Sequence, residues 1–250
     1  MNILDRYGIK EVADVTFYEI DKNSGEAGAP VLYLDTLKVS TIEQTAESTS
    51  ARGGKGNPEL IMWDYGKEIT LTLEDALFSA KSMALMYGVD IETGKDKQNK
   101  DFADENEILK TVKPSQVSAD GSKITINGQD FTVSGSVTYY DENGSSTTNK
   151  ASAAYATAKI TVSGQKIVIS SDKFPKTYYI TGDTYARSET TGDDEFFQFI
   201  IPKAKMQSEV TLTMEAEGDP STFNMSLKVL RPANGEMMKL VKYSLPGSGS

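Results

Sequence analysis

The amino-acid sequence predicts a mainly β protein, built as a β-sandwich or an open β-barrel with one flanking helix. Short segments rich in β-branched and aromatic residues alternate between apolar and polar positions, which is typical of half-buried strands. Asparagine–glycine pairs at 127–128 and 143–144 are strong hairpin signals. Only one stretch of the 250 residues spaces its apolar side chains as an amphipathic helix does.

The N-terminal segments begin with a turn, a strand and a long polar stretch. Residues 21–30 form a turn cluster, and the β-branched and aromatic residues of 31–42 predict a strand. Residues 43–59 are polar, small and glycine-rich, which predicts a long exposed loop. Loops of this length inside a compact domain are usually functional or mobile. Residues 60–66 resume apolar character, and 67–73 alternate as a half-buried strand.

Residues 74–87 form the one segment with a helical pattern. Thr72 and Asp75 stand at the spacing of a capping box, with Asp in place of Glu, and Gly88 supplies a natural C-terminal stop. The alanines of this segment allow close packing against a sheet or a neighbouring subunit. The apolar stripe consists of Leu73, Ala76, Leu77, Ala80, Ala84 and Tyr87.

A shift in composition divides the chain. Residues 91–107 are highly charged and are interpreted as a solvated linker, whereas 108–175 are rich in Ser, Thr, Gly and Val and are interpreted as an inserted small β module. Residues 1–90 and 176–246 then form one discontinuous β domain, and 247–250 are a linker or a cloning remnant. The alternative is one domain with elaborated hairpins. C-terminal strands are expected at 177–187, 195–205, 209–218, 223–232 and 236–245.

Composition excludes several kinds of chemistry. The chain has no cysteine and no histidine, which removes disulfides, zinc sites of the usual kind and Ser-His or Cys-His catalytic pairs. We expect no cofactor. The 26 basic and 36 acidic residues give a net charge of −10, which repels phosphate at long range. The N-terminal residues carry charges throughout and no apolar run reaches the length of a membrane span. We therefore expect a soluble protein with no membrane anchor, not exported by a cleaved signal.

The glycine-rich stretch 52–57 raises the question of a phosphate-binding loop. Two glycines and Lys55 resemble the end of that motif, but the motif needs a hydroxyl residue and a helix after the lysine. The residues that follow are Gly56, Asn57 and Pro58, and a proline disfavours helical geometry at the residue before it. We therefore interpret the stretch as a flexible surface loop.

The other candidate sites also have simple structural explanations. Glu215 and Glu217, or the acidic run 193–195, suit acid–base chemistry, but each stands where charge solvates a turn or a strand end. Residues 21–26 begin like a calcium loop, yet Leu32 occupies the twelfth position, where a bidentate Glu is needed. The residues therefore indicate no enzyme.

Two long segments, 31–79 and 177–232, resemble the tail tube (major tail) proteins of tailed bacteriophages. The resemblance covers about residues 1–90 and 176–245, and the middle region departs from it. It implies a β-sandwich or barrel of the phage tail-tube type, with one flanking α-helix. It also implies that six copies join their sheets edge to edge into a ring, and that rings stack into a hollow tube.

The resemblance further implies which residues mediate assembly. The long loop is expected to reach the adjacent ring, the helix to lie at the subunit boundary, and the apolar run after the loop to anchor it. The loop residues are Arg52, Gly53, Gly54, Lys55, Gly56 and Asn57; the helix residues are Ala76, Leu77, Ala80, Ala84 and Tyr87; the anchor is Leu60, Ile61, Met62 and Trp63.

These features predict a structural virion protein, a tail tube subunit that self-assembles into a DNA conduit. Its expected partners are further copies of itself, other phage tail proteins, and DNA that passes an acidic lumen without specific binding. It is expected in the virion tail, and in the host cytoplasm during assembly. The alternatives are another tail or baseplate component, a β-sandwich carbohydrate-binding module that uses Trp63, and an enzyme with a carboxylate pair. Trp63 and Tyr65 can stack on a sugar, but such a pair more often belongs to a core or an interface.

Overall fold

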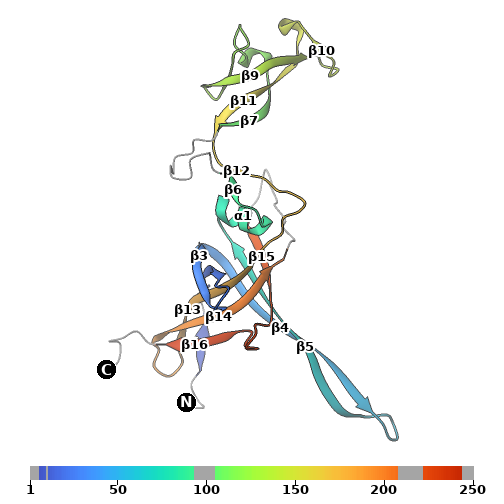
Figure 1. The fold of residues 1–250 in the computed structure, drawn as a ribbon, viewed down its shortest axis with the longest axis vertical. Coiled ribbons are helices and arrows are strands. Elements are labelled where there is room, and N and C mark those ends of the chain that lie inside the picture. The colour runs from blue at the N-terminus through green and yellow to red at the C-terminus, as the bar shows by residue number, and fades with distance from the viewer. Residues whose placement is uncertain (1–5, 10, 93–104, 208–221, 244–250) are drawn as a thin grey trace. The chain divides into compact units, whose positions relative to one another are not determined.

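The computed structural model describes residues 6–9, 11–92, 105–207 and 222–243 (Figure 1). The chain divides into two compact units. The first, called the barrel unit, comprises residues 1–90 and 169–250, and the second, called the small unit, comprises residues 91–168. Both are antiparallel β structures, and the mainly β fold class predicted from the sequence is confirmed.

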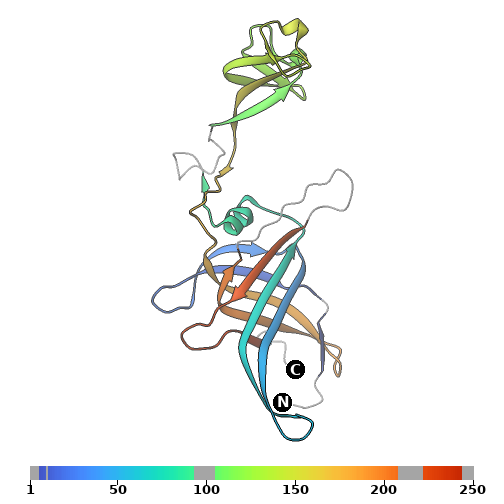
Figure 2. The same cartoon turned by 90° about the vertical axis from the view of Figure 1, so that its right-hand side faces the viewer.

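The described residues of the barrel unit form one nine-stranded antiparallel sheet (Figure 2). Seven strands follow one path: β3 (Ala27–Leu34), β2 (Asp14–Ile20), β13 (Thr177–Ser188), β14 (Asp194–Met206), β15 (Phe223–Val229), β5 (Glu59–Asp75) and β4 (Leu37–Arg52). Two short strands complete it: β1 (Tyr7–Ile9) continues the β2 edge of β13, and β16 (Lys239–Tyr243) continues the β15 edge of β14.

The short connection between β3 and β4 curls this sheet into an open barrel, in which these two end strands do not pair with each other. The two strands lie at opposite ends of the path, yet only Asp35 and Thr36 separate them. Three peptide units span about 11 Å at most, so the ends of the sheet must curl toward each other. Thr36 holds the corner, because its hydroxyl donates to Asp75 Oδ1 at 2.6 Å and its carbonyl accepts from the Ala76 N–H at 3.1 Å. The single strand predicted at 31–42 is therefore wrong: the chain turns this corner between two strands.

The turn before β3 is shorter than predicted. β3 begins at Ala27, so only residues 21–26 form the turn. The Asp21 carboxylate accepts from the N–H groups of Asn23 and Ser24, both at 2.9 Å, and Gly25 takes a φ of 75°. These bonds, that from Ser24 first, lower the pKa of Asp21. The carboxylate is thus a turn-forming group, as the turn interpretation of this stretch predicts.

The core of the barrel unit comes from strands that alternate inward and outward. Ile69, Leu71 and Leu73 of β5 point inward, as the alternation predicts. Gly182 of β13 lies under the ring of its cross-strand partner Phe199, where a Cβ atom would come within 2.1 Å of the ring. The largest side chains that are fully buried in this core are Val15, Phe17, Leu71, Leu73, Ile180, Ile201, Met206, Met225 and Leu227.

The helix is shorter than the sequence predicts. α1 spans Ala80–Tyr87, and its capping box uses Ser79 and Ser82, with Ser82 N–H donating to Ser79 Oγ at 3.0 Å. The predicted start at residue 74 is wrong, because β5 runs on to Asp75 and pairs there with β15. The Asp75 carboxylate is buried and accepts from Thr36 and from the Leu77 N–H instead of capping a helix. Gly88 ends α1 in the left-handed conformation, as predicted.

The small unit has a separate sheet and core. Its sheet follows the order β10 (Ser146–Thr147), β9 (Gln129–Tyr140), β11 (Tyr155–Ser163) and β7 (Glu105–Val112), and β8 (Lys123–Ile126) pairs with β9. Two short 3-10 helices, η1 (Pro114–Gln116) and η2 (Lys150–Ser152), join strands, and β6 (Ile91–Glu92) pairs with β12 (Lys166–Ile167). The hairpin predicted at Asn127-Gly128 is confirmed, with φ values of 50° and 82°. The hairpin at Asn143-Gly144 joins β9 to β10.

Some expectations lie outside the described residues. The strand expected at 209–218, with the carboxylates Glu215 and Glu217, is one of them, and most of the charged segment 91–107 is another. The remaining C-terminal strands are found as β13, β14, β15 and β16.

Candidate assembly surfaces

A long hairpin takes the place of the loop predicted at 43–59. β4 and β5 are paired from Leu37↔Asp75 out to Arg52↔Glu59, so only residues 53–58 lie outside the strands. The hairpin extends beyond the other strands of the barrel unit (Figures 1 and 2). The loop prediction is wrong because these residues show no alternation between apolar and polar side chains. They form a strand through backbone pairing with β5, not by covering a core.

A β-bulge separates the outer part of the hairpin from the barrel. Thr45 pairs with Glu68 and Glu47 pairs with Tyr65, so Ala46 stands opposite two residues. One of these is Gly66, whose φ of 63° lies in the left-handed region that glycine adopts easily. Residues 47–65, beyond the bulge, are called the arm. The strand segment from residue 59 to the bulge alone extends about 24 Å.

The arm exposes apolar side chains on both of its faces. Leu60 and Met62 point to one face and are 64% and 60% exposed, while Ile61, Trp63 and Tyr65 point to the other and are 54%, 52% and 52% exposed. A two-stranded hairpin is marginally stable on its own in water. Five large apolar side chains on one such ribbon indicate a surface that another molecule covers. That the anchor residues Leu60–Trp63 contact a neighbouring subunit stays a prediction. Within the described part of their own chain they are exposed and do not belong to a hydrophobic core.

The arm tip is a tight glycine-rich turn. The Asn57 N–H donates to the Gly54 carbonyl at 3.1 Å, and Gly56 has a φ of 85°, as the third residue of a type II turn requires. The turn joins two strands, and no helix begins in it. Arg52 pairs with Glu59 across the hairpin at 3.2 Å, so this guanidinium is engaged inside the arm. Lys55 has no ion pair with any described residue.

The residues expected on one helical stripe do not share a helix. Ala76 and Leu77 precede α1, and Leu77 is 65% exposed. Ala84 is buried in α1, whereas Ala80 and Tyr87 are half-buried. The stripe as predicted is therefore wrong, because its first part belongs to β5 and the bend that follows.

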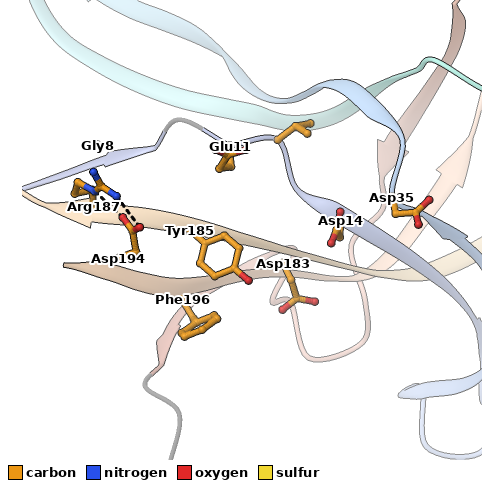
Figure 3. A pocket seen from close by; sticks show the side chains of 10 residues that line it. Gly8, Glu11, Asp14, Asp35, Asp183, Tyr185, Arg187, Asp194 and Phe196 are labelled. Atoms are coloured by element: carbon orange, nitrogen blue, oxygen red, sulfur yellow. Dashed lines mark hydrogen bonds and ion pairs between the residues drawn. The ribbon is translucent and has the colours of Figure 1, made fainter. Parts of the chain in front are cut away.

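A cleft lies on the outer face of the barrel unit (Figure 3). Its volume is about 660 Å³. Arg187 and Asp194 form a bidentate pair at one end, with both N···O distances at 2.7 Å. That pairing holds the pKa of Asp194 below its ordinary value. The cleft is lined by Gly8, Glu11, Val12, Asp14, Asp35, Asp183, Tyr185, Arg187, Asp194 and Phe196.

Nothing local in the sequence reveals this cleft. Its residues come from the β1–β2 segment, the corner between β3 and β4, and the β13–β14 hairpin, which only the sheet topology brings together. The acidic run 193–195 was the one signal nearby. Asp194 binds Arg187, and Glu195 forms an ion pair with Lys242, so the structure engages both carboxylates in sheet contacts.

The described residues contain no cluster of acidic side chains arranged to hold a metal ion. Nor does any helix among them have the length and apolar character needed to cross a membrane. The described part of the barrel unit presents an exposed apolar arm, a carboxylate-lined cleft, and two strand edges that pair with no other described strand.

Comparison with known proteins agrees with this picture. The chain matches the model of the YomU/Tube protein family over residues 7–242. It is similar to a tail tube protein of Bacillus phage SPR, with 24% identity over 229 residues that cover 83% of this chain and 78% of that relative. Because the family model spans nearly the whole chain, including both units, this protein belongs to the YomU/Tube protein family.

Proposed function

We propose that this protein is a structural subunit of a bacteriophage tail tube and works by self-assembly, without catalysis. Membership of the YomU/Tube family and similarity to a tail tube protein support this role. Its partners are further copies of itself and other tail proteins. It assembles in the host cytoplasm and resides in the tail of the virion, with residues 91–168 as an insertion into the tube-forming barrel unit.

The single observation that carries the proposal is the arm. Its apolar side chains are exposed on both faces, and none of the described residues of the barrel unit covers them. In a stack of rings the arm reaches the next ring, where both faces are buried between copies. The apolar run Leu60–Trp63 then serves as the inter-subunit anchor.

The sheet edges support a closed ring. β3 and β4 end the strand path, and among the described residues each pairs with a single neighbour. Unpaired edges of eight and sixteen residues are templates for further strand pairing. Six copies that join such edges leave no free edge, which is the ring expected for a tail tube.

The outer face of β4, β5 and β15 fits the lining of the lumen. This face carries cross-strand neighbours with hydroxyl groups, with Thr41 opposite Thr72, and Thr72 opposite Ser226. Val39 and Asn224, opposite Glu74, also lie on it. Glu43, Glu68 and Glu74 add negative charge, and the cation beside them, Lys228, is paired with Glu68 at 2.6 Å. Such a surface offers DNA phosphates hydroxyl groups and repulsion, so DNA passes without binding.

Electron microscopy of the purified full-length chain tests the proposal. We expect rings or hollow tubes at high protein concentration, or after mixing with other tail components. A variant in which an Asn-Gly turn joins Thr45 directly to Glu68 removes the arm and should keep the barrel while losing the stacked tubes. A chain that stays monomeric under all of these conditions would contradict the proposal.

The lumen assignment has a separate test. In the variant Glu43→Lys/Glu74→Lys, tubes should still form, because both side chains point away from the core. These tubes should retain double-stranded DNA at low salt and release it as salt rises, whereas unmodified tubes should not bind it. Equal DNA retention by both kinds of tube would mean that the outer face of β4, β5 and β15 does not line the lumen.

A carbohydrate-binding role is the second candidate, favoured by one observation. Trp63 and Tyr65 are both about half exposed on the same face of β5, a spacing that suits stacking on sugar rings. Binding of the chain to a glycan array, lost on Trp63→Ala while tubes are still formed, would support this role. Loss of tubes without any glycan signal would support the assembly role.

A further inference from the structure

We propose that the cleft receives the arm tip of a second copy, with Lys55 placed among the cleft carboxylates. This inference rests on the proposed function and extends it, because it names the surface that accepts the arm. Three observations carry it: the charge of the cleft, the aromatic wall beside it, and the form of the arm tip.

The cleft carries an excess of negative charge. Arg187, the single cation among the described residues that line it, is already neutralised by the bidentate contact with Asp194. The remaining carboxylates line one cavity, and no described lysine or arginine forms an ion pair with any of them. A cationic occupant gains attraction from all of them at once. These carboxylates are Glu11, Asp14, Asp35 and Asp183.

The groups that already contact these carboxylates are neutral. Tyr33 Oη donates to Asp14 Oδ2 at 3.3 Å, and Gln198 Nε2 donates to Asp183 Oδ1 at 2.9 Å. Burial, and then the charges of Asp14, Asp35 and Asp183, raise the pKa of the Tyr33 phenol. The phenol therefore stays a neutral donor, and no lysine or arginine among the described residues of the copy forms an ion pair that offsets the negative charge.

An aromatic wall stands next to the carboxylates. The rings of Tyr185 and Phe196 lie 4.9 Å apart between centroids, and Phe196 stacks on Tyr243 at 5.4 Å. Tyr185 is 48% exposed. A ligand that fits the cleft therefore combines a positive charge with apolar or aromatic groups behind it.

The arm presents that combination in the same order. Lys55 stands at its end, flanked by Gly54 and Gly56, which have no side chains to widen the tip. The apolar side chains follow on β5, from Leu60 to Trp63. The net charge of the whole chain is −10, so a lysine at a projecting tip is attracted to the acidic surface of a second copy.

The occupant must come from another copy. The arm continues β4 and β5 away from its own barrel, on the opposite side from the turn between β13 and β14, the two strands that supply much of the cleft lining (Figure 1). The arm and the cleft are different surfaces, so the contact is heterologous and repeats from copy to copy. Such a contact propagates along a stack, which is what a tube needs.

Cross-linking tests the contact directly. The natural chain has no cysteine, so single-cysteine variants report one position each. Lys55→Cys protein and Asp35→Cys protein, made with different tags, are mixed, allowed to assemble and treated with a short thiol-reactive cross-linker. We expect a mixed dimer at least about tenfold more abundant than with Lys55→Cys and Lys110→Cys, where residue 110 lies exposed in the small unit.

Charge exchange tests the energetics. Lys55→Glu and Asp35→Lys should each raise the concentration needed for tube formation by at least about tenfold. The double variant Lys55→Glu/Asp35→Lys should recover most of that loss. Lys110→Glu changes the net charge as Lys55→Glu does and should leave assembly unchanged.

The outcomes separate this inference from the proposed function. If the unmodified chain forms no tubes, the proposed function fails. If tubes form and need the arm, but neither the cross-link nor the charge recovery is seen, the arm docks on another surface and only this inference fails. Circular dichroism of each variant establishes that the barrel is folded before assembly is scored.

Discussion

The two halves of β5 differ in burial: the inner half, in the barrel, packs one face against the core, and the outer half, in the arm, is exposed on both faces. In the barrel, Ile69, Leu71 and Leu73 are buried and alternate with polar side chains, so one face meets the core and the other meets solvent. In the arm, five successive positions from Leu60 to Asp64 are exposed, and the apolar ones occupy both faces. The inner half satisfies its side chains within the chain. The outer half leaves its apolar side chains exposed, and under the proposed function a second copy covers them.

The comparison is tested first at the core. Leu71→Ala removes a fully buried side chain and should lower the free energy of unfolding by about 2–5 kcal/mol. Met62→Ala in the arm should change it by less than about 0.5 kcal/mol, because that side chain is exposed in the free copy. Urea unfolding of monomeric protein measures both values. Equal losses at the two sites would mean that the arm is packed within its own copy.

The second test moves to the arm. Ile61→Ser/Trp63→Ser removes two apolar side chains from one face of the ribbon and should leave monomer stability nearly unchanged. The concentration needed for tube formation should rise at least about tenfold, since burying each side chain is worth about 1.5–3 kcal/mol. Sedimentation of tubes gives that concentration. Leu109→Ser, on an exposed leucine of the small unit, is the control, and it should have no effect.

The boundary between the halves gives a smaller effect. Gly66→Ala places a side chain at a φ of 63° and should cost about 1–2 kcal/mol in the local folding of the hairpin. Hydrogen exchange of the arm amides should quicken, while the amides of β13 keep their protection. Gly164→Ala, where φ is not positive and no atom lies within 4 Å of the new Cβ, should be nearly neutral.

The smallest expected effect concerns an arginine–carboxylate pair in the barrel, which is compared with a similar pair in the arm. Each pair links the two strands of a hairpin. Arg187 holds Asp194 by two bonds of 2.7 Å in the barrel, whereas Arg52 reaches Glu59 by one bond of 3.2 Å in the arm. The pKa of Asp194 is lowered by Arg187, so this pair stabilises the fold above the ordinary carboxyl pKa, and the contribution disappears as pH falls through the lowered value. In Arg187→Met, NMR titration should show that pKa rise. An unchanged pKa would contradict the assignment.

The sequence predicts the inner half of β5 well and the arm poorly. Alternation at Ile69, Leu71 and Leu73 is a signal that burial on one face imposes, and it identifies the strand without any other information. Residues 43–52 carry no such signal, because neither of their faces meets a core. Their strand conformation depends on backbone partners at 59–70, so their polar composition taken alone indicates a loop.

The helix start and the cleft are missed for related reasons. Residues 74–77 fit a helical stripe, but pairing of Glu74 and Asp75 with β15 keeps them extended. Gly88 and the Asn127-Gly128 turn are predicted correctly because their geometry depends on glycine at that position. The cleft joins residues as distant as Glu11 and Asp194, and no local pattern encodes their meeting.

The uninterrupted course of β4 and β5 from arm to barrel has a mechanical consequence. A pull on the arm along its axis is carried through Glu68 and Thr45 into strands that are paired on to Asp75 and, through β15, to the rest of the sheet. Such tension loads many hydrogen bonds in shear at the same time instead of opening them one by one. A filament joined by these arms would resist stretching through the strength of its sheets, while the glycine at each bulge leaves it free to bend.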